Sequence, residues 1–310
     1  MVSRVLDSRN VRLTFWLRAV GLLVILGEPD AALAWGPATH VGLACSVLEH
    51  LGLLPAAVAA ILSKHAISYI YGSVAADVVF AKRLSRVKQF CHHWSTAMRL
   101  LEGAEDARGR AFAYGYLSHL AADTVAHGKY VPHQLMLSDC TINFGHLYWE
   151  LRADATATES TWQLLDSVLK VDHESHHEAL AGLMTDTFLS YELNRVLFDR
   201  LNAMTVHQGF RRTIGVWGRY SRWYLPPGLI EGYRIESVER IQAILSEGAR
   251  SALLHEDPNG TSALMRARIQ RRELQRMKRR GLPVHRRLRE ASDALAPKRW
   301  HVAQPEALPA

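Results

Sequence analysis

The stretch Tyr116-Leu-Ser-His-Leu-Ala-Ala-Asp-Thr-Val-Ala-His127 decides the fold class and the chemistry that we expect of this chain. Its small and apolar residues favour a helix, in which residues four apart drift only about 40° around the axis. His119, Asp123 and His127 therefore share one stripe. Two imidazoles and a carboxylate are ligands that suit zinc. The alternative is a polar stripe with a titrating histidine and an ion pair.

The rest of the chain has the composition of a globular, helical protein. Of its 310 residues 48% are hydrophobic and 22% are charged. Apolar residues recur at helical spacing nearly everywhere, without the alternation that strands show, and we find no internal repeat. We therefore predict an all-α protein with a single multi-helix domain at residues 35–255. A basic helical tail is expected at residues 256–310.

The first 34 residues have the pattern of an export signal. Four arginines precede the apolar run at residues 19–26, and Ala32-Leu-Ala34 provides a small-x-small cleavage site. The run is shorter than the roughly 20 residues of a membrane-spanning helix, although an uncleaved signal anchor stays the alternative. We expect an exported protein, periplasmic or secreted. The three cysteines are an odd number and imply no complete disulfide framework.

Positive charge is concentrated near the C-terminus. The net charge is +7, and residues 261–290 contain eleven Lys/Arg against two Glu. Residues 265–280 are expected to form a basic helix that ends at Gly281-Leu-Pro283. Such a helix can contact an anionic membrane surface or nucleic acid, and the alternative is a solvated helix face or tail.

Further candidate metal ligands flank the central stripe. Cleavage after Ala34 would leave Trp35 with a free α-amino group, a metal ligand once deprotonated, and His40 opens a predicted helix. Asp77 ends the turn Tyr71-Gly-Ser-Val-Ala-Ala-Asp77, and two histidines follow in Phe90-Cys-His-His-Trp94. His146 and Glu150 stand four apart, on one helical face. The nine candidates suit three four-coordinate metals that share one carboxylate: Trp35, His40, Asp77, His92 (or His93), His119, Asp123, His127, His146 and Glu150.

In this order the residues resemble the zinc-dependent phospholipase C and single-strand nuclease superfamily, whose members are all-α proteins with a trinuclear zinc site. The resemblance covers roughly residues 35–150. The spacing from Trp35 to His40 looks like that of fungal single-strand nucleases. The Asp123-x3-His127 spacing and the His-His-Trp segment look more like bacterial phospholipase C/D-type domains. The chain departs from the family in having no recognisable β-sandwich lipid-binding module and no nuclease-type disulfide set.

The resemblance implies a zinc ligand set for each of three metals. Asp77, His92, His119 and Asp123 would bind one zinc, and Asp123 would bridge to a second zinc at Trp35 and His40. His127, His146 and Glu150 would hold the third. The family pattern favours His92 over His93, whereas the helical stripe favours His127 over its competitor His133. The cluster Asp172-His-Glu-Ser-His-His177 matches no family position, and we expect a solvated loop or helix start there.

The expected function is that of a zinc-dependent phosphodiester hydrolase of the phospholipase C type, with up to three Zn²⁺. A metal-activated water would be the nucleophile, and Asp77 would be the catalytic general base. Phospholipid or another phosphodiester would be the substrate, with peripheral contact to an anionic membrane through residues 265–280. The first alternative is a single-strand nuclease or other exported phosphoesterase, which would bind nucleic acid. The second is a non-catalytic metal-binding module associated with a membrane.

Overall fold

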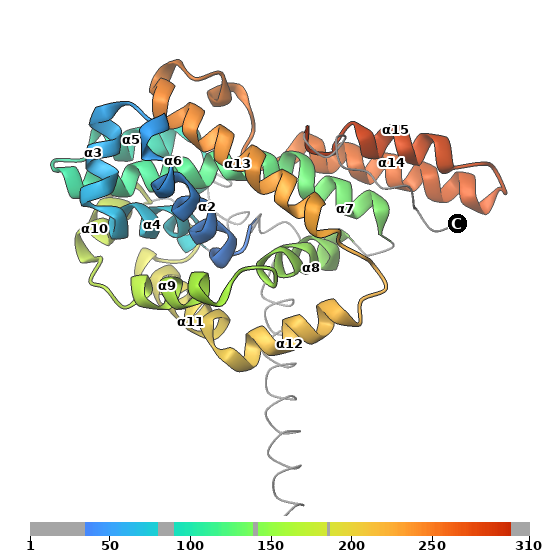
Figure 1. Cartoon of the computed structure of the whole chain (residues 1–310), viewed down its shortest axis with the longest axis horizontal. Helices are drawn as coiled ribbons and strands as arrows, with labels where there is room; N and C mark the ends of the chain where they lie inside the picture. The colour runs from blue at the N-terminus through green and yellow to red at the C-terminus, as the bar shows by residue number, and fades with distance from the viewer. Residues whose placement is uncertain (1–34, 80–89, 139–141, 185–186, 299–310) are drawn as a thin grey trace, which may run out of the picture.

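The computed structural model describes residues 35–79, 90–138, 142–184 and 187–298 as a set of packed helices (Figure 1). No β-strand occurs among these residues, so the all-α prediction is confirmed. The α-helices are α2 (Pro37–Glu49), α3 (Ala56–Lys64), α4 (Ala66–Ala75), α5 (Trp94–Glu102), α6 (Ala107–Val125), α7 (Val131–Leu137), α8 (Ile142–Asp154), α9 (Glu159–Leu169), α10 (Glu174–Leu183), α11 (Tyr191–Val206), α12 (Gln208–Arg219), α13 (Pro227–Glu247), α14 (Thr261–Arg279) and α15 (His285–Asp293). Short 3-10 turns cover Leu51–Leu53, Ala76–Val78, Phe90–His92, Gly248–Arg250 and Ala252–His255.

Helix α6 is the centre of the fold and packs against α4, α5 and α13. Its contact with α4 is unusually close because two glycines face each other there. A Cβ atom on Gly72 would lie 2.1 Å from the carbonyl oxygen of Phe112, and one on Gly115 would lie 2.0 Å from that of Tyr69. Only glycine permits this approach. It brings the end of α4, and with it Asp77, next to the polar stripe of α6.

The stripe itself departs from a simple α-helix at its C-terminal end. Asp106 caps the start of α6 by accepting a hydrogen bond from the amide of Gly109. The α-helix ends at Val125, and a π-helical turn, Ala126–Tyr130, follows before α7 begins. We predicted that one α-helix continues through His127. That prediction is wrong for the last turn, where the helix is of the π type. Such π-turns occur often at functional sites.

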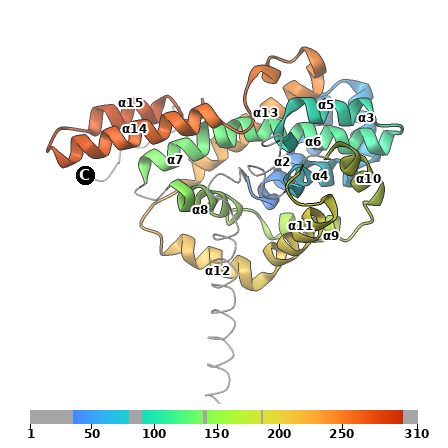
Figure 2. The same ribbon diagram turned by 180° about the vertical axis from the view of Figure 1, so that it is seen from behind.

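Helices α14 and α15 form a hairpin that extends beside α7 (Figures 1 and 2). Helix α14 packs on α7 and on the π-helical turn, and its residue Ala267 is buried. Most of its arginines are exposed. No helix among the described residues is sufficiently long and apolar to span a bilayer. The predicted export signal and Cys140 lie outside the described residues.

Candidate metal centre

Four imidazoles converge on the carboxylate of Asp123, which is fully buried in α6. Its Oδ2 atom lies 3.2 Å from Nε2 of His119 and 3.3 Å from Nε2 of His92. The same oxygen is 3.8 Å from Nε2 of His127, and Oδ1 is 3.5 Å from Nε2 of His40. Helix α2, the turn before α5, α6 and the π-helical turn each supply one of these imidazoles.

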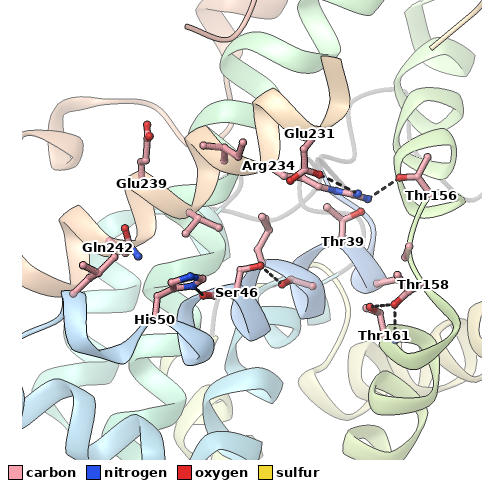
Figure 3. A pocket seen from close by; sticks show the side chains of 17 residues that line it. Thr39, Ser46, His50, Thr156, Thr158, Thr161, Glu231, Arg234, Glu239 and Gln242 are labelled. Atoms are coloured by element: carbon pink, nitrogen blue, oxygen red, sulfur yellow. Dashed lines mark hydrogen bonds and ion pairs between the residues drawn. The ribbon is translucent and has the colours of Figure 1, made fainter. Parts of the chain in front are cut away.

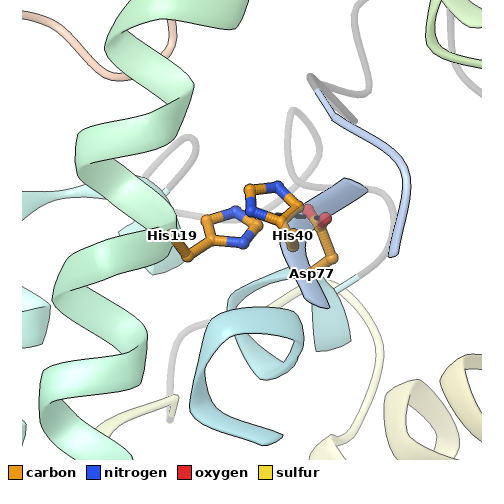
Figure 4. A group of neighbouring side chains, drawn as sticks. All are labelled: His40, Asp77 and His119. Atoms are coloured by element: carbon orange, nitrogen blue, oxygen red, sulfur yellow. Dashed lines mark ion pairs between the residues drawn. The ribbon is translucent and has the colours of Figure 1, made fainter. Parts of the chain in front are cut away.

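Asp77 closes the cluster from the end of α4. Its Oδ1 atom lies 3.3 Å from Nε2 of His92, and Oδ2 lies 3.9 Å from Nε2 of His119. Figure 4 shows His40 and His119 with their rings stacked and Asp77 beside them; the ring centroids are 4.0 Å apart. Donor atoms of His40, Asp77 and His119 lie within 4.8 Å of one another, as do those of His92, His119 and Asp123. One metal ion can be held at each of these spacings.

Several polar atoms of the cluster are buried without a hydrogen bond among the described residues. They include both ring nitrogens of His127, Nε2 of His40 and both carboxylate oxygens of Asp123. Buried polar atoms in folded proteins nearly always have a partner. A cation between imidazoles and carboxylate would supply that partner, and nitrogen with oxygen ligands is the set that zinc takes. The residues therefore fit a zinc site.

The protonation states also suit a metal. Burial lowers the pKa of His40, and it lowers that of His127 well below its usual value. Both imidazoles are therefore neutral near pH 7, which is the form that binds metals. Burial alone would raise the pKa of Asp123, but the imidazole of His119, with those of His40 and His92, holds it well below its usual range. The carboxylate stays ionised.

A main-chain carbonyl orients one of these imidazoles. Nδ1 of His119 lies 2.9 Å from the carbonyl oxygen of Ser73 in α4. Because a carbonyl only accepts hydrogen bonds, the Nδ1–H of His119 donates to it, and Nε2 faces Asp123. Partners of this kind fix the tautomer and the ring orientation of metal-binding histidines.

Helix α8 places a histidine and a glutamate beside the cluster. His146 and Glu150 are buried, with Nε2 3.0 Å from Oε1. The ring of His146 meets that of His127 edge to face, with centroids 5.1 Å apart. The four-residue spacing of the sequence therefore does place both groups on one face, beside the π-helical turn.

The start of α2 is held by an acid that the sequence analysis missed, and Trp35 just before it stacks on an aromatic ring. Trp35 is fully buried and stacks on Tyr130, with ring centroids 4.7 Å apart. Asp154 accepts hydrogen bonds from the amide of Thr39 (2.9 Å), from its hydroxyl (2.6 Å) and from the amide of Ala38 (3.3 Å). Burial raises the pKa of Asp154 to about 6, against these hydrogen bonds. A signal existed, since Asp154 continues the His146-x3-Glu150 spacing by four residues.

The structure separates the competing histidines by position. His92 is fully buried within the cluster, whereas His93 is half-buried at the N-cap of α5. His133 contacts the hydroxyls of Tyr233 (2.6 Å) and Ser292 (2.5 Å), on the side of α7 that faces α13 and α15. Geometry therefore groups His92 and His127 with Asp123.

The histidines of residues 172–177 are buried, so the expectation of a solvated cluster is wrong. His173, His176 and His177 are 3–5% exposed, and α10 starts between the first two. The ring of His173 stacks on Tyr71 at 3.5 Å. His177 bridges two tyrosine hydroxyls, with Nε2 2.8 Å from Tyr71 and Nδ1 2.7 Å from Tyr191. Aromatic neighbours in α4 and α11 that are remote in sequence explain their burial.

The turn at residues 256–260 contacts the main chain at His92 and at His127. The sequence analysis also missed this contact. Asn259 is buried, and its Nδ2 atom donates to the carbonyl of His92 at 3.3 Å. The indole of Trp94 donates to the carbonyl of Glu256 at 2.9 Å. Gly260 lies against His127. The Asp257-Pro-Asn-Gly260 sequence signals a turn but says nothing of what it touches. The predicted domain boundary at residue 255 stays a prediction.

Two cavities among the described residues differ in their relation to this cluster. The larger, about 480 Å³, is a groove of mixed polar and apolar side chains between α2, the start of α9 and α13, and none of the nine candidates lines it (Figure 3). The smaller, about 60 Å³, is bordered by Asp77 and Glu150 and otherwise mostly by apolar side chains of α8, α11 and α12. The smaller cavity therefore borders the cluster.

Comparison with known families agrees with this geometry. The family described as zinc dependent phospholipase C matches residues 39–194, a range that contains every candidate ligand except Trp35. Comparisons with curated proteins and with solved structures gave no match. The match spans half of the chain, so this protein belongs to the zinc-dependent phospholipase C family and is a hydrolase that acts on phosphoric ester bonds.

Proposed function

We propose that this protein is an exported phospholipase C that hydrolyses the phosphodiester of phospholipid head groups with up to three zinc ions. The observation that carries the proposal is the convergence of His40, His92, His119 and His127 on the buried carboxylate of Asp123. The family match supports the substrate class.

The proposed ligand sets follow the family resemblance, and the contacts of four imidazoles with Asp123 support them. Asp77, His92, His119 and Asp123 would hold one zinc, and Asp123 would also serve a second, together with His40 and the main chain of Trp35. His127, His146 and Glu150 hold the third. The neutral imidazoles, the ionised Asp123 and the ring contact between His127 and His146 support this assignment.

Asp77 is the proposed general base. Zinc bound at the cluster would supply a Lewis acid for the phosphate oxygens and a lowered pKa for water. The side chain of Asp77 is 11% exposed, whereas those of Asp123 and Glu150 are 0% and 3% exposed. Asp77 is therefore the most open carboxylate of the three. An Oδ atom of Asp77 can accept the proton of an attacking water, while His119 is held in place by the carbonyl of Ser73.

Residues 265–280, mostly within α14, are proposed to contact the anionic membrane that carries the substrate. Exposed arginines on this helix include Arg272, Arg276 and Arg279, and each basic residue near an anionic bilayer contributes about 1 kcal/mol. Removing the whole segment would also remove most of a helix that packs on α7 and that includes the buried Ala267. Replacing exposed arginines by glutamine is therefore the cleaner test. Weaker binding to anionic vesicles, with unchanged turnover of a soluble substrate, is the expected result.

One assay tests the proposed function directly. Zinc-loaded protein that begins at Trp35 is given phosphatidylcholine, single-stranded DNA and bis-p-nitrophenyl phosphate side by side. We expect turnover of the lipid and of the small diester, and a large loss of both in Asp77→Asn, assayed at saturating zinc because Asp77 is also a proposed ligand. Turnover of DNA without turnover of lipid would select the nuclease alternative, and a zinc-loaded protein that turns over none of the three would overturn the proposal.

A further inference from the structure

The surface formed by the end of α12 and the loop after it has an unusual composition. Residues 208–230 contain four arginines and no aspartate or glutamate. Arg211 pairs with Glu159, whereas Arg212, Arg219 and Arg222 are exposed. The local charge is therefore positive and reaches solvent.

Large apolar side chains are exposed among these arginines. Tyr220 and Tyr224 are 82% and 77% exposed, and Val216 is 54% exposed. The guanidinium of Arg222 lies over the ring of Trp223, 4.5 Å from its centroid. Tyrosine and tryptophan side chains concentrate where one end meets hydrocarbon and the other meets water. Arginine beside them adds attraction to lipid phosphate.

This surface is attached to the helix that carries two candidate ligands. The hydroxyl of Tyr148 in α8 donates to Ser221. Arg152, also in α8, donates to the hydroxyl of Tyr148 (2.7 Å) and to the carbonyl of Trp223 (3.1 Å). The loop therefore sits on the same helix as His146 and Glu150. Figures 1 and 2 show α12 on one side of α8 and the α14–α15 hairpin on the other.

The inner face of α12 borders the candidate site. Phe210 and Ile214 line the cavity of about 60 Å³ that Asp77 and Glu150 also border. The outer face of the same helix carries Val216 and Arg219. A single helix thus separates the apolar side of the site from the exposed tyrosine and arginine surface.

We propose that residues 216–224, the docking segment, rest on a phospholipid bilayer that contains anionic lipid. Tyr220 and Tyr224 enter the headgroup region, and Arg219 and Arg222 contact phosphate. This inference rests on the proposed phospholipase function and adds a surface that is separate from the basic residues 265–280. Docking through this segment would place the bilayer on the outer side of α12, whose inner side lines the apolar cavity beside the metal cluster. Exposed tyrosines also stack on nucleic-acid bases, and the test below includes that outcome.

The test measures binding of the protein that begins at Trp35 to vesicles of phosphatidylcholine alone and of phosphatidylcholine mixed with phosphatidylglycerol. Tyr220→Ser with Tyr224→Ser should weaken binding to both vesicle types, on the order of tenfold, because apolar contact does not depend on lipid charge. Arg219→Gln with Arg222→Gln should weaken binding to the anionic vesicles and reduce its dependence on salt. Turnover of bis-p-nitrophenyl phosphate should stay unchanged in all variants.

Two matched controls separate this surface from others. Leu193→Ser with Val196→Ser removes apolar side chains of α11 that are 46% and 51% exposed, and binding should stay as in the wild type. Arg276→Gln with Arg279→Gln removes charge from α14 instead. Vesicle binding that responds to the α14 variant and not to the docking-segment variants overturns this inference. It is equally overturned if the wild type does not bind vesicles, or if the tyrosine variants change only binding of single-stranded DNA. Vesicle binding that behaves as expected, in a protein without phosphoesterase turnover, would count against the proposed function alone.

Discussion

Gly260 lies directly against the main chain of His127. A Cβ atom on Gly260 would be 2.3 Å from the carbonyl oxygen of His127 and 2.5 Å from its Cβ atom. Gly260 also has φ +59°, a left-handed conformation that glycine adopts without strain. Only glycine fits at position 260, the residue that immediately precedes α14. This close contact sets the distance between α14 and the π-helical turn of the metal cluster.

Gly260→Ala is expected to destabilise the protein by about 3 kcal/mol or more, through the overlap with His127 and the left-handed backbone. Zinc content should fall as well, because the displaced main chain belongs to a proposed ligand. Chemical denaturation and elemental analysis of the purified variant measure the two effects.

Gly281→Ala is the matched control for this prediction. Gly281 has φ +69°, but a Cβ atom there would meet nothing within 4 Å. The control isolates the conformational penalty, about 1 to 2 kcal/mol, and should leave the zinc content unchanged. Equal effects from both glycines would show that the contact with His127 has no role of its own.

Asp123→Asn and Glu150→Gln should differ in how much zinc they remove. Asp123 faces four imidazoles, so the loss of its charge should empty two of the proposed zinc sites together. Glu150 lies beside His146, and its replacement should deplete one site. Elemental analysis of both variants at equal free zinc measures the difference. Equal depletion by the two substitutions would contradict a bridging role for Asp123.

A segment left attached before Trp35 should lower zinc content and soluble turnover more than it lowers stability. An amide nitrogen is a much poorer ligand than a free amine, so affinity at that site should fall on the order of tenfold or more. The stacking of Trp35 on Tyr130 does not depend on the amine and should hold the fold together. Tagged and processed proteins are compared by zinc titration and thermal unfolding. Full zinc affinity in the tagged protein would exclude the amine as a ligand.

Acid should weaken the fold through the buried histidines of α10. Burial lowers the pKa of His176 and of His177 to about 4, from 6.5 in the unfolded chain. Well above pH 6.5, both histidines are neutral in the folded and in the unfolded protein. As the pH falls from 6.5 to 4, the unfolded chain binds protons that the folded protein excludes, so the free energy of unfolding declines. His176→Gln with His177→Gln should flatten this decline, as measured by denaturation at saturating zinc.

His285→Gln serves as the control for the acid effect, because His285 is exposed in α15. Its pH dependence of unfolding should match that of the wild type. The histidines of the metal cluster are unchanged in all three proteins, so their contribution cancels in the comparison. An unchanged slope in the double variant would show that the buried histidines of α10 do not govern the acid response.

Local spacing explains which parts of the site could be predicted from the sequence. The four-residue intervals from His119 to Asp123, and from His146 to Glu150, are set by the helical repeat alone. The prediction of a continuous α-helix failed at Ala126–Tyr130, because nothing in the local sequence pattern there indicates a π-helical turn. It also failed for His173, His176 and His177, whose burial depends on aromatic residues of distant helices.

The sequence by itself determined an all-α chain with a stripe of zinc-type ligands, because helical periodicity and ligand chemistry are both local properties. Only the tertiary structure decided that His92 rather than His93 lies near Asp123, and that Asp154 holds the start of α2. It also decided that Asn259 and Gly260 contact the cluster from outside the matched family region. These relationships join segments far apart in sequence. They exist because the close contact of α4 with α6, at Gly72 and Gly115, and the packing of α14 on α7 bring those segments together.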